Sequence, residues 1–285
     1  MKAKRSLGQH FLNSEKYLSA IVDAGNIHAD DLILEIGPGT GLLTEKLLKL
    51  AGRVIAVEKD KELVILLKEK FKEEIALGKL DLIEKDILDF DLTKQFHLIP
   101  NYDLANRSLL VCPGEQKRSS GSGKIIYKII ANIPYYITGA ILRKFLQSDF
   151  QPEQMILLVQ KEVAQRIVAR DKKESLLSIS VKVYGQPKLI KTVPAGAFSP
   201  APKVDSAILA ISDISKRDLN EKNFFKVLKA GFAHKRKLLI NNLSGLFNKE
   251  LIKKAFAECK IDEKTRPETL NLNNWLCLTN ELSRN

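Results

Sequence analysis

Apolar residues in the first half of the chain alternate between short continuous runs and helical spacing. The runs Asp31–Ile36, Arg53–Val57 and Lys79–Ile83 are rich in aliphatic residues and bounded by polar ones, which is typical of buried strands. Helical patterns precede or separate them, over residues 14–24, 42–50 and 60–72. Strands that alternate with helices at this spacing predict an α/β fold with a parallel, doubly wound sheet.

A fourth apolar run, Lys124–Ile130, leads into Ala131-Asn132-Ile133-Pro134-Tyr135-Tyr136, where the proline takes the chain out of the strand. Helices are then predicted over 138–147 and 161–169, an amphipathic segment over 175–184, and strands over 155–159, 187–193 and 205–211. The last two strands could pair as a hairpin. From about residue 213 the pattern is entirely helical, with helices expected over 221–231, 235–247, 249–258 and 267–282. We therefore predict one domain over 1–212 and a second over 213–285.

The stretch 95–124 interrupts this regular pattern. It contains Cys112-Pro-Gly-Glu115 and ends in the Gly/Ser-rich segment Ser119–Gly123. A loop of this length is uncommon in a compact domain, and its last part is typical of a flexible linker. We expect a surface insertion rather than part of a catalytic site.

Composition narrows the class of protein. The 285 residues include 46 Lys and Arg against 34 Asp and Glu, a net charge of +12. Such an excess favours a polyanionic partner, with a membrane surface as the weaker alternative. No apolar stretch is long enough to span a bilayer, and Met1–Gly8 has no apolar signal core. We expect a cytoplasmic protein that does not bind membranes.

The numbers and spacing of the cysteines and histidines also favour a cytoplasmic protein. Cys112, Cys259 and Cys277 are odd in number and far apart, and the four histidines show no ligand spacing. This pattern favours a reducing compartment and argues against a zinc site. We predict no metal.

A glycine-rich turn, Gly37-Pro-Gly39-Thr-Gly41, lies between the first of these strands and the helix that follows. Glycines there let the backbone approach a nucleotide closely. The spacing is G-x-G-x-G, and Leu42 stands where a dinucleotide fingerprint has its third glycine. This spacing disfavours a nicotinamide dehydrogenase.

Two acids follow the next two strands. Glu58 lies 17 residues after Gly41, where an acid that binds ribose hydroxyls is usual, and Asp86 could accept from an adenine amine. Either acid alone could be a solvated strand end. Because both would meet the glycine turn at one edge of the sheet, they predict a pocket for an adenosine-containing cofactor.

The tetrad Asn132–Tyr135 offers what a planar, amine-bearing ring needs. Asn132 and the Ile133 carbonyl can accept hydrogen bonds from the amine, and Tyr135 presents a stacking face. An ordinary strand-ending turn is the alternative, since Asn and Pro are common turn residues.

Taken together, these motifs resemble those of the KsgA-type ribosomal RNA adenine dimethyltransferases. The resemblance covers about residues 4 to 275. It rests on five stretches in order: Gly8–Leu12, Glu35–Gly41, Asn132–Tyr135, Phe198–Ser206 and Phe232–Lys237. It implies a Rossmann-like methyltransferase domain that uses S-adenosyl-L-methionine and a smaller C-terminal all-helical domain. The 95–124 insertion is longer than the family's usual connection.

The resemblance also assigns roles to single residues. It implies cofactor contacts from His10, Leu12, Gly37, Gly39, Glu58, Asp86 and Asn132. The catalytic set would be Asn132, Ile133, Tyr135 and Phe198, with the two aromatic rings enclosing a flipped adenine. A buried core aromatic is the alternative for Phe198.

Basic residues would bind the RNA backbone. Lys216–Lys237 holds eight Lys or Arg against two acids, half of the whole chain's excess. A solvated charged helix surface is the alternative. The predicted phosphate contacts are Lys4, Arg5, Lys203, Lys235, Arg236 and Lys237.

The expected activity is dimethylation of N6 on two adjacent adenosines near the 3′ end of small-subunit (16S) rRNA, during maturation of that subunit. We expect a monomer that acts without a dedicated general base. The alternatives are the related large-subunit (23S) dimethylase of the macrolide-resistance type and a non-catalytic ribosome assembly factor. The intact cofactor motifs argue against the assembly factor.

Overall fold

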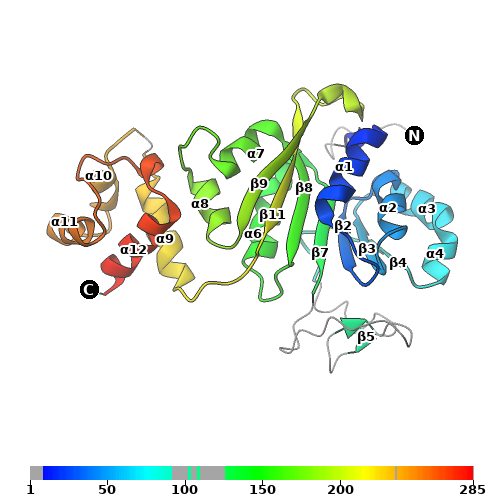
Figure 1. Ribbon diagram of the computed structural model, residues 1–285, viewed down its shortest axis with the longest axis horizontal. Helices are drawn as coiled ribbons and strands as arrows, with labels where there is room; N and C mark the ends of the chain where they lie inside the picture. The colour runs from blue at the N-terminus through cyan, green and yellow to red at the C-terminus, as the bar shows by residue number, and fades with distance from the viewer. Residues whose placement is uncertain (1–8, 92–101, 104–107, 110–125, 235, 285) are drawn as a thin grey trace. The chain divides into compact units, whose positions relative to one another are not determined.

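The computed structural model describes residues 9–91, 102–103, 108–109, 126–234 and 236–284 (Figure 1). The chain divides into two compact units. The first, here called the sheet unit, comprises Met1–Ala164 and Lys188–Ile214, and the second, the helical unit, comprises Gln165–Pro187 and Ser215–Asn285.

The sheet unit is built on a seven-stranded sheet in the order β4-β3-β2-β7-β8-β11-β9 (Figure 1). Its strands are β2 (Leu32–Ile36), β3 (Arg53–Glu58), β4 (Leu80–Glu84), β7 (Lys128–Asn132), β8 (Gln154–Gln160), β9 (Gln186–Val193) and β11 (Ser206–Ser212). The strands from β4 to β8 are parallel, and β11 is antiparallel to β8. The predicted doubly wound α/β fold is confirmed, and the two late strands are neighbours as expected.

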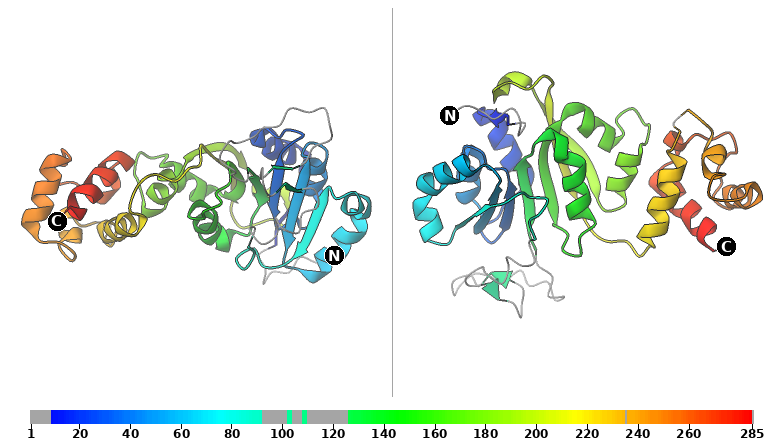
Figure 2. Two further views of the ribbon diagram at one scale, coloured as in Figure 1. Left: turned by 90° about the horizontal axis from the view of Figure 1, so that it is seen from below. Right: turned by 180° about the vertical axis from the view of Figure 1, so that it is seen from behind.

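Helices cover both faces of this sheet (Figure 2). They are α1 (Glu15–Gly25), α2 (Leu42–Leu48), α3 (Lys61–Lys70), α4 (Lys72–Ala76), α6 (Thr138–Leu146) and α7 (Lys161–Val168). The connections through α2 and α3 run along the sheet in one direction and the connection through α6 in the other. Because such crossovers are right-handed, α2 and α3 lie on the face opposite α6.

One predicted helix is shorter than expected. The helix predicted over 60–72 ends at Lys70, and α4 begins two residues later. The buried ring of Phe71 lies at the break, with a backbone conformation that no longer propagates the helix. Periodicity alone does not show such a break, because both segments keep helical spacing.

Ion pairs at the amino ends fix the register of the central strands. Lys128 Nζ lies 2.7 Å from Asp31 Oδ2, and both side chains are buried. Arg53 donates to both carboxylate oxygens of Asp81, at 2.6 and 2.9 Å. A buried pair must stay matched because a single unpaired charge is costly. Because the register is fixed at the amino ends, the carboxyl ends of these strands are aligned with one another as well.

The helical unit is a small bundle around a buried tryptophan. It contains α8 (Leu176–Lys182), α9 (Glu221–Gly231), α10 (Leu239–Leu243), α11 (Lys249–Glu258), the 3₁₀ turn η4 (Pro267–Thr269) and α12 (Leu272–Ser283). Trp275 is fully buried, and a Cβ placed on Gly231 would come within 2.3 Å of its ring. Glycine is thus required where α9 meets α12.

Sequence patterning misplaced part of this unit. The helical unit comprises Gln165–Pro187 as well as Ser215–Asn285, whereas the predicted second domain covered 213–285. The Ser215 amide donates to the Tyr184 carbonyl at 2.9 Å, and Arg217 Nε donates to the Val183 carbonyl at 2.9 Å. These bonds join segments that are distant in sequence, which composition cannot reveal.

Two helices of the unit are shorter than predicted. Of the segment predicted over 235–247, the structure describes 236–247, and within those residues only Leu239–Leu243 is α-helical. The 267–282 segment begins as the 3₁₀ turn η4, and α12 starts at Leu272 because Asn271 and Asn274 form a capping box.

The cysteine pattern was also misread. Cys259, at the end of α11, and Cys277, in α12, form a disulfide although they are 18 residues apart in sequence. Antiparallel packing of two helices brings together residues that show no motif spacing. A disulfide between these two residues does not fit the reducing compartment that the cysteine pattern favoured, while Cys112 lies outside the described residues.

Most of the 95–124 insertion lies outside the described residues as well. Of it, the structure gives only β5 (Tyr102–Asp103) paired with β6 (Ser108–Leu109). No helix among the described residues is long and apolar enough to cross a membrane. Within the same residues, no group of three His, Cys, Asp or Glu side chains could hold a metal ion.

Candidate active site

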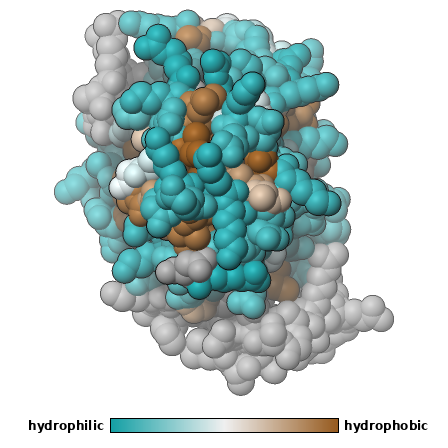
Figure 3. Space-filling model, turned by 90° about the vertical axis from the view of Figure 1, so that its left-hand side faces the viewer, coloured by the Kyte–Doolittle hydropathy of each residue, from teal (hydrophilic) through white to brown (hydrophobic). Residues whose placement is uncertain are grey.

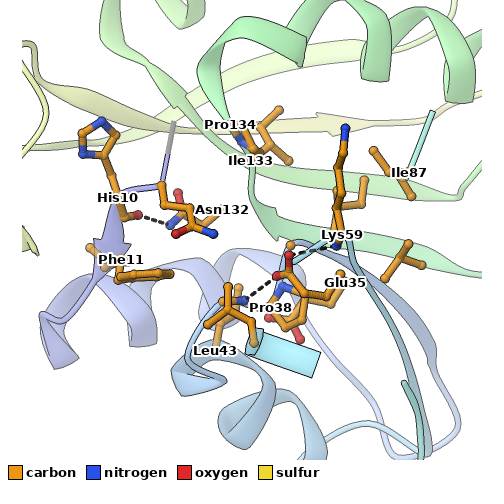
Figure 4. A pocket seen from close by; sticks show the side chains of 18 of the residues that line it. His10, Phe11, Glu35, Pro38, Leu43, Lys59, Ile87, Asn132, Ile133 and Pro134 are labelled. Carbon is orange, nitrogen blue, oxygen red and sulfur yellow. Dashed lines mark hydrogen bonds between the residues drawn. The ribbon is translucent and has the colours of Figure 1, made fainter. Parts of the chain in front are cut away.

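A pocket opens at the carboxyl ends of β2, β3 and β7 (Figure 4). The strand order reverses between β2 and β7, the position at which open α/β sheets bind ligands. Segments that are distant in sequence line it, among them the N-terminal stretch around His10, the glycine turn after β2, the ends of β3 and β4, and the tetrad at the end of β7. The site predicted from separate motifs is therefore a single cavity.

The glycine turn forms the floor of this pocket. Gly37 has φ +66° and Gly39 has φ +60°, values that side-chain-bearing residues rarely adopt. A Cβ on Gly39 would lie 2.9 Å from the Phe11 ring, whereas a Cβ on Gly37 would meet nothing within 4 Å. Gly39 thus allows the N-terminal segment to close over the turn, and Gly37 leaves open space for a ligand.

Glu58 ends β3 beneath this turn. Its Oε1 accepts from the amides of Lys59 (2.8 Å) and Asp60 (2.9 Å), and its Oε2 accepts from the Gly39 amide at 3.2 Å. The side chain is buried, and burial raises its pKa while the backbone amides oppose that effect. Three donors hold the carboxylate in one orientation, so the lone pair that remains on Oε2 is fixed as an acceptor for a hydroxyl.

Asp86, after β4, is held by a neighbouring lysine. Lys59 Nζ lies 2.7 Å from Asp86 Oδ2, and the Leu88 amide donates to Oδ1 at 2.9 Å. The Lys59 ammonium, followed by the Leu88 amide, holds the pKa of Asp86 below its usual range. Asp86 is thus a charged acceptor that lines the pocket.

Glu35 is a further acid, within β2. It is 1% exposed, lines the pocket, and its Oε2 has no hydrogen-bond partner among the described residues. Burial raises its pKa to about 8, against a smaller lowering by the Thr44 hydroxyl, and the nearby Glu58 charge adds to the rise. Glu35 is therefore mostly protonated at neutral pH.

The segment Gln9–Asn13, here called the N-terminal strap, is fastened across the pocket at both edges. Gln9 Nε2 donates to Asp60 Oδ2 at 3.0 Å, and His10 Nδ1 lies 2.8 Å from the Pro200 carbonyl. Within the strap, β1 (Phe11–Leu12) pairs antiparallel with β10 (Phe198–Ser199), and the Asn13 amide donates to the Ala197 carbonyl. The strap therefore joins the glycine-turn side of the pocket to the loop before β11.

Asn132, the last residue of β7, connects the strap to the tetrad. Its Nδ2 donates to the His10 carbonyl at 3.0 Å (Figure 4). That bond fixes which end of the amide is the donor, so Oδ1 remains the acceptor. The predicted acceptor role of Asn132 is compatible with this geometry.

Tyr135 is positioned from two sides. Its hydroxyl lies 2.5 Å from Ser206 Oγ at the start of β11, and its ring stacks on His10 with centroids 6.0 Å apart and planes 20° apart. Burial raises the pKa of the phenol, and the Ser206 hydroxyl partly opposes that rise. The ring is thus a neutral, oriented face at the pocket.

The structure separates Phe198 from the other predicted catalytic residues. Phe198 is 6% exposed and belongs to the hydrophobic core with Leu12 and Val193. It is absent from the described residues that line the pocket. The structure therefore supports the alternative role of Phe198, a buried core aromatic. Pairing of β10 with β1 turns its ring inward.

The other predicted site residues fall into three groups. His10, Leu12, Gly37, Gly39, Glu58, Asp86, Asn132, Ile133 and Tyr135 all line the pocket. Lys203, Arg236 and Lys237 are exposed. Lys4, Arg5 and Lys235 lie outside the described residues. Around the helical unit, the face seen in Figure 3 is covered mostly by hydrophilic side chains.

Sequence reasoning did not single out Glu35, Lys59 or Ser206. Glu35 is the only charged residue of the otherwise aliphatic strand β2, and that is a signal for a buried acid. Ser206 stands inside the quoted Phe198–Ser206 motif. Lys59 carries no signal of its own, because exposed lysines are common.

The residues present fit an adenosine-containing methyl donor. An oriented carboxylate that can accept from a ribose hydroxyl, a second acid at the pocket edge and open space at Gly37 lie in one cavity. Glu35 Oε2 is buried and has no hydrogen-bond partner among the described residues. A polar group of a ligand in this cavity could supply that partner.

Comparison with known proteins agrees with this geometry. The family described as "Ribosomal RNA adenine dimethylase" matches residues 1–284. Proteins named "Ribosomal RNA small subunit methyltransferase A" are similar over nearly the whole chain. That of Dehalococcoides mccartyi strain BAV1 is 40% identical over 98% of this chain and 88% of its own, and that of Rippkaea orientalis is 36% identical over 98% and 97%.

Solved structures show the same fold. A dimethyladenosine transferase from Plasmodium falciparum has a TM-score of 0.71 and 25% identity, covering 96% of this chain and 98% of its own. The 23S rRNA methyltransferase ErmE has a TM-score of 0.70 at 21% identity, covering 96% and 99%. The chain belongs to the ribosomal RNA adenine dimethylase family, whose enzymes take the methyl group from S-adenosyl-L-methionine.

Proposed function

We propose that this enzyme dimethylates N6 of two adjacent adenosines near the 3′ end of 16S rRNA during small-subunit maturation. The observation that carries the proposal is the single pocket in which an oriented amide and an aromatic ring face the predicted cofactor residues. Relatives at 34–41% identity are named for the small subunit. The likeness to ErmE, at 21% identity, supports the fold alone.

When bound, S-adenosyl-L-methionine supplies an activated methyl group on a sulfonium. Glu58 would accept from the ribose hydroxyls and Asp86 from the adenine amine, with Lys59 giving up part of its hold on Asp86. His10, Leu12, Gly37 and Gly39 would surround the rest, because the strap and the glycine turn face one another across the pocket. These assignments rest on the acceptor geometry of each side chain.

On the other side of the pocket, the chain would orient the target amine. Asn132 Oδ1 and the Ile133 carbonyl would accept its two hydrogens, which favours a pyramidal nitrogen whose lone pair is free for in-line attack. The N6–carbon bond forms as the sulfur–carbon bond breaks. The displaced proton then passes to water, because no Asp, Glu or His stands in the tetrad. A monomethylated amine keeps one N–H for the same acceptors, so a second transfer uses the same site.

Tyr135 would stack on the target adenine. Its ring already has a fixed orientation through Ser206 and His10, so little ordering is lost on binding. Phe198 takes no part in this proposal, because the structure places it in the core.

Exposed basic residues would hold the rRNA backbone. Lys203 in the sheet unit and Arg236 and Lys237 in the helical unit are exposed, and the net charge of +12 favours a polyanion. We further propose that the enzyme is a cytoplasmic monomer that does not bind membranes, since its substrate is the cytoplasmic ribosome. The Cys259–Cys277 disulfide is unusual for that compartment.

The deciding experiment is methyl transfer from labelled S-adenosylmethionine to unmethylated small subunits, with large-subunit RNA in parallel. Label recovered as N6,N6-dimethyladenosine from the small subunit alone is the expected result. Transfer to large-subunit RNA alone would overturn the substrate assignment. Cofactor or subunit binding without any transfer would instead identify a non-catalytic assembly factor.

A further inference from the structure

Tyr136 has an unusual place on the surface of the sheet unit. Its side chain is 65% exposed, although it lines the mouth of the pocket directly after Tyr135. Every other Phe, Tyr or Trp whose burial the structure describes is buried or partly buried. Single exposed hydrophobic residues are common and need no explanation. This one, however, stands at the entrance through which an RNA base must pass.

The backbone beneath Tyr136 is fixed while its ring is not. The Ile137 amide donates to the Pro134 carbonyl at 3.2 Å, and Thr138 Oγ1 donates to the Tyr135 carbonyl at 3.0 Å. The Tyr135 hydroxyl is hydrogen-bonded to Ser206, and one face of its ring stacks on His10. No hydrogen bond or ring contact holds Tyr136 within the described part of the chain. Two adjacent tyrosines therefore offer one ring that is locked and one that is free.

Cationic side chains lie on the same pocket as Tyr136. Lys59 and Lys85 line the same pocket, and both are exposed. Nearby, Lys144 reaches the Leu88 carbonyl at 2.9 Å, and Leu88 also lines the pocket. An aromatic ring among lysines is the combination that binds single-stranded nucleic acid, because bases stack on the ring while cations pair with phosphates. The rim of this pocket thus has the chemistry of a nucleotide site outside the target site.

We propose that Tyr136 stacks on the base next to the adenosine that is being methylated. This inference rests on the proposed function and deepens it. When the target adenine leaves the RNA stack, the neighbouring base loses a stacking partner, and unstacking has a substantial cost. An aromatic face at the pocket mouth replaces that partner. Because the two adenosines are adjacent, each in turn would be the neighbour while the other is methylated.

The test compares kcat/KM for unmethylated small subunits among the wild type, Tyr136→Ala, Tyr136→Phe and Ile65→Ala. Ile65, on α3, is 70% exposed and does not line the pocket, so it controls for loss of an exposed apolar side chain. We expect Tyr136→Ala to lower kcat/KM on the order of ten-fold, as loss of one base–aromatic stack does. Tyr136→Phe and Ile65→Ala should match the wild type, and the Kd for S-adenosylmethionine should not change.

A second comparison identifies the base. Subunits whose rRNA carries a pyrimidine beside a single target adenosine should be poorer substrates for the wild type, because a pyrimidine stacks less. For Tyr136→Ala the same change of base should have little effect, since the aromatic ring on which the base would stack is already missing. Additive losses would overturn the assignment to the neighbouring base.

Other results separate this inference from the proposed function. If the wild type is active and Tyr136→Ala is equally active, the stacking role of Tyr136 would be overturned, but the proposed function would stand. Weaker cofactor binding by that variant, or a Tyr136→Phe variant as impaired as Tyr136→Ala, would also overturn the stacking role. A wild-type enzyme that transfers no methyl to small subunits would overturn the proposed function itself.

Discussion

The two sides of the pocket use opposite chemistry. On the cofactor side three acids, Glu35, Glu58 and Asp86, line the cavity, and each is influenced by burial, backbone amides or Lys59. On the target side the polar groups of the tetrad Asn132–Tyr135 are one side-chain amide, one phenol and backbone carbonyls. Carboxyl groups therefore lie where hydroxyls and a cofactor amine need acceptors, although of the three only Asp86 has a lowered pKa and Glu35 is mostly protonated at neutral pH.

The absence of charge in the tetrad has a chemical reason. A carboxylate beside the target amine would compete for the proton that the reaction releases and would stabilise the cationic cofactor before reaction. Neutral acceptors orient the amine without that ground-state stabilisation. This pocket would thus bind the cofactor through acidic side chains on one side and align the target amine through neutral groups on the other. Four substitutions, in decreasing order of expected effect, test this division.

Asn132→Ala should produce the largest loss, because it removes an acceptor aimed at the reacting nitrogen. We expect turnover on small subunits to fall about 10²- to 10³-fold, the usual loss for one positioned transition-state contact. Asn132→Asp is the matched variant, since it keeps the shape and an acceptor but places a negative charge beside the His10 carbonyl. If Asn132→Ala kept wild-type turnover, the assigned alignment role would be wrong.

Glu58→Gln should act on affinity rather than on chemistry. One carboxylate oxygen becomes an NH₂ group that cannot accept from the backbone amides, so the cofactor Kd measured by calorimetry should rise about 10- to 100-fold. At saturating cofactor, kcat should stay within a few-fold of the wild type. A large fall in kcat with unchanged Kd would show that the two sides of the pocket are not separate in function.

Glu35→Gln should change how stability depends on pH. The folded state raises the pKa of Glu35 from 4.5 to about 8. Between these values the folded protein holds a proton that the unfolded chain has released, so the free energy of unfolding falls as pH rises, by up to about 1.4 kcal/mol per pH unit.

The Gln variant has no proton to lose and should remove this contribution. Its stability relative to the wild type should therefore increase from pH 4.5 to pH 8, as urea unfolding at a series of pH values would measure. Parallel curves for the two proteins would mean that Glu35 is ionised when folded.

Lys59→Ala should have the smallest effect. It frees Asp86 Oδ2 from the 2.7 Å ion pair, and solvent screens such an exposed pair so that it contributes little. We therefore expect cofactor affinity to increase by no more than about a few-fold. Lys61→Ala, which removes the exposed partner of Glu84, is the control. Weaker cofactor binding by Lys59→Ala would mean that the lysine itself contacts the cofactor.

The order of strands and helices and the outline of the pocket could be predicted from the sequence. Short aliphatic runs predicted strands at β2, β3, β4 and β7; β2, β3 and β7 are buried as expected, whereas β4 lies at the edge of the sheet and is only partly buried. Acids and an amide directly after such runs must meet at one sheet edge, since parallel strands end there together. Gly37, Glu58, Asp86 and Asn132 could be assigned to one site for that reason.

Only the tertiary structure decided what depends on contacts between distant segments. The pairing of β1 with β10 fastens the N-terminal strap over the pocket and turns Phe198 into the core, and neither two-residue strand has a detectable pattern. The Cys259–Cys277 disulfide and the assignment of 165–187 to the helical unit have the same origin. Local periodicity reports which side of an element is buried, but it does not report which partner buries it.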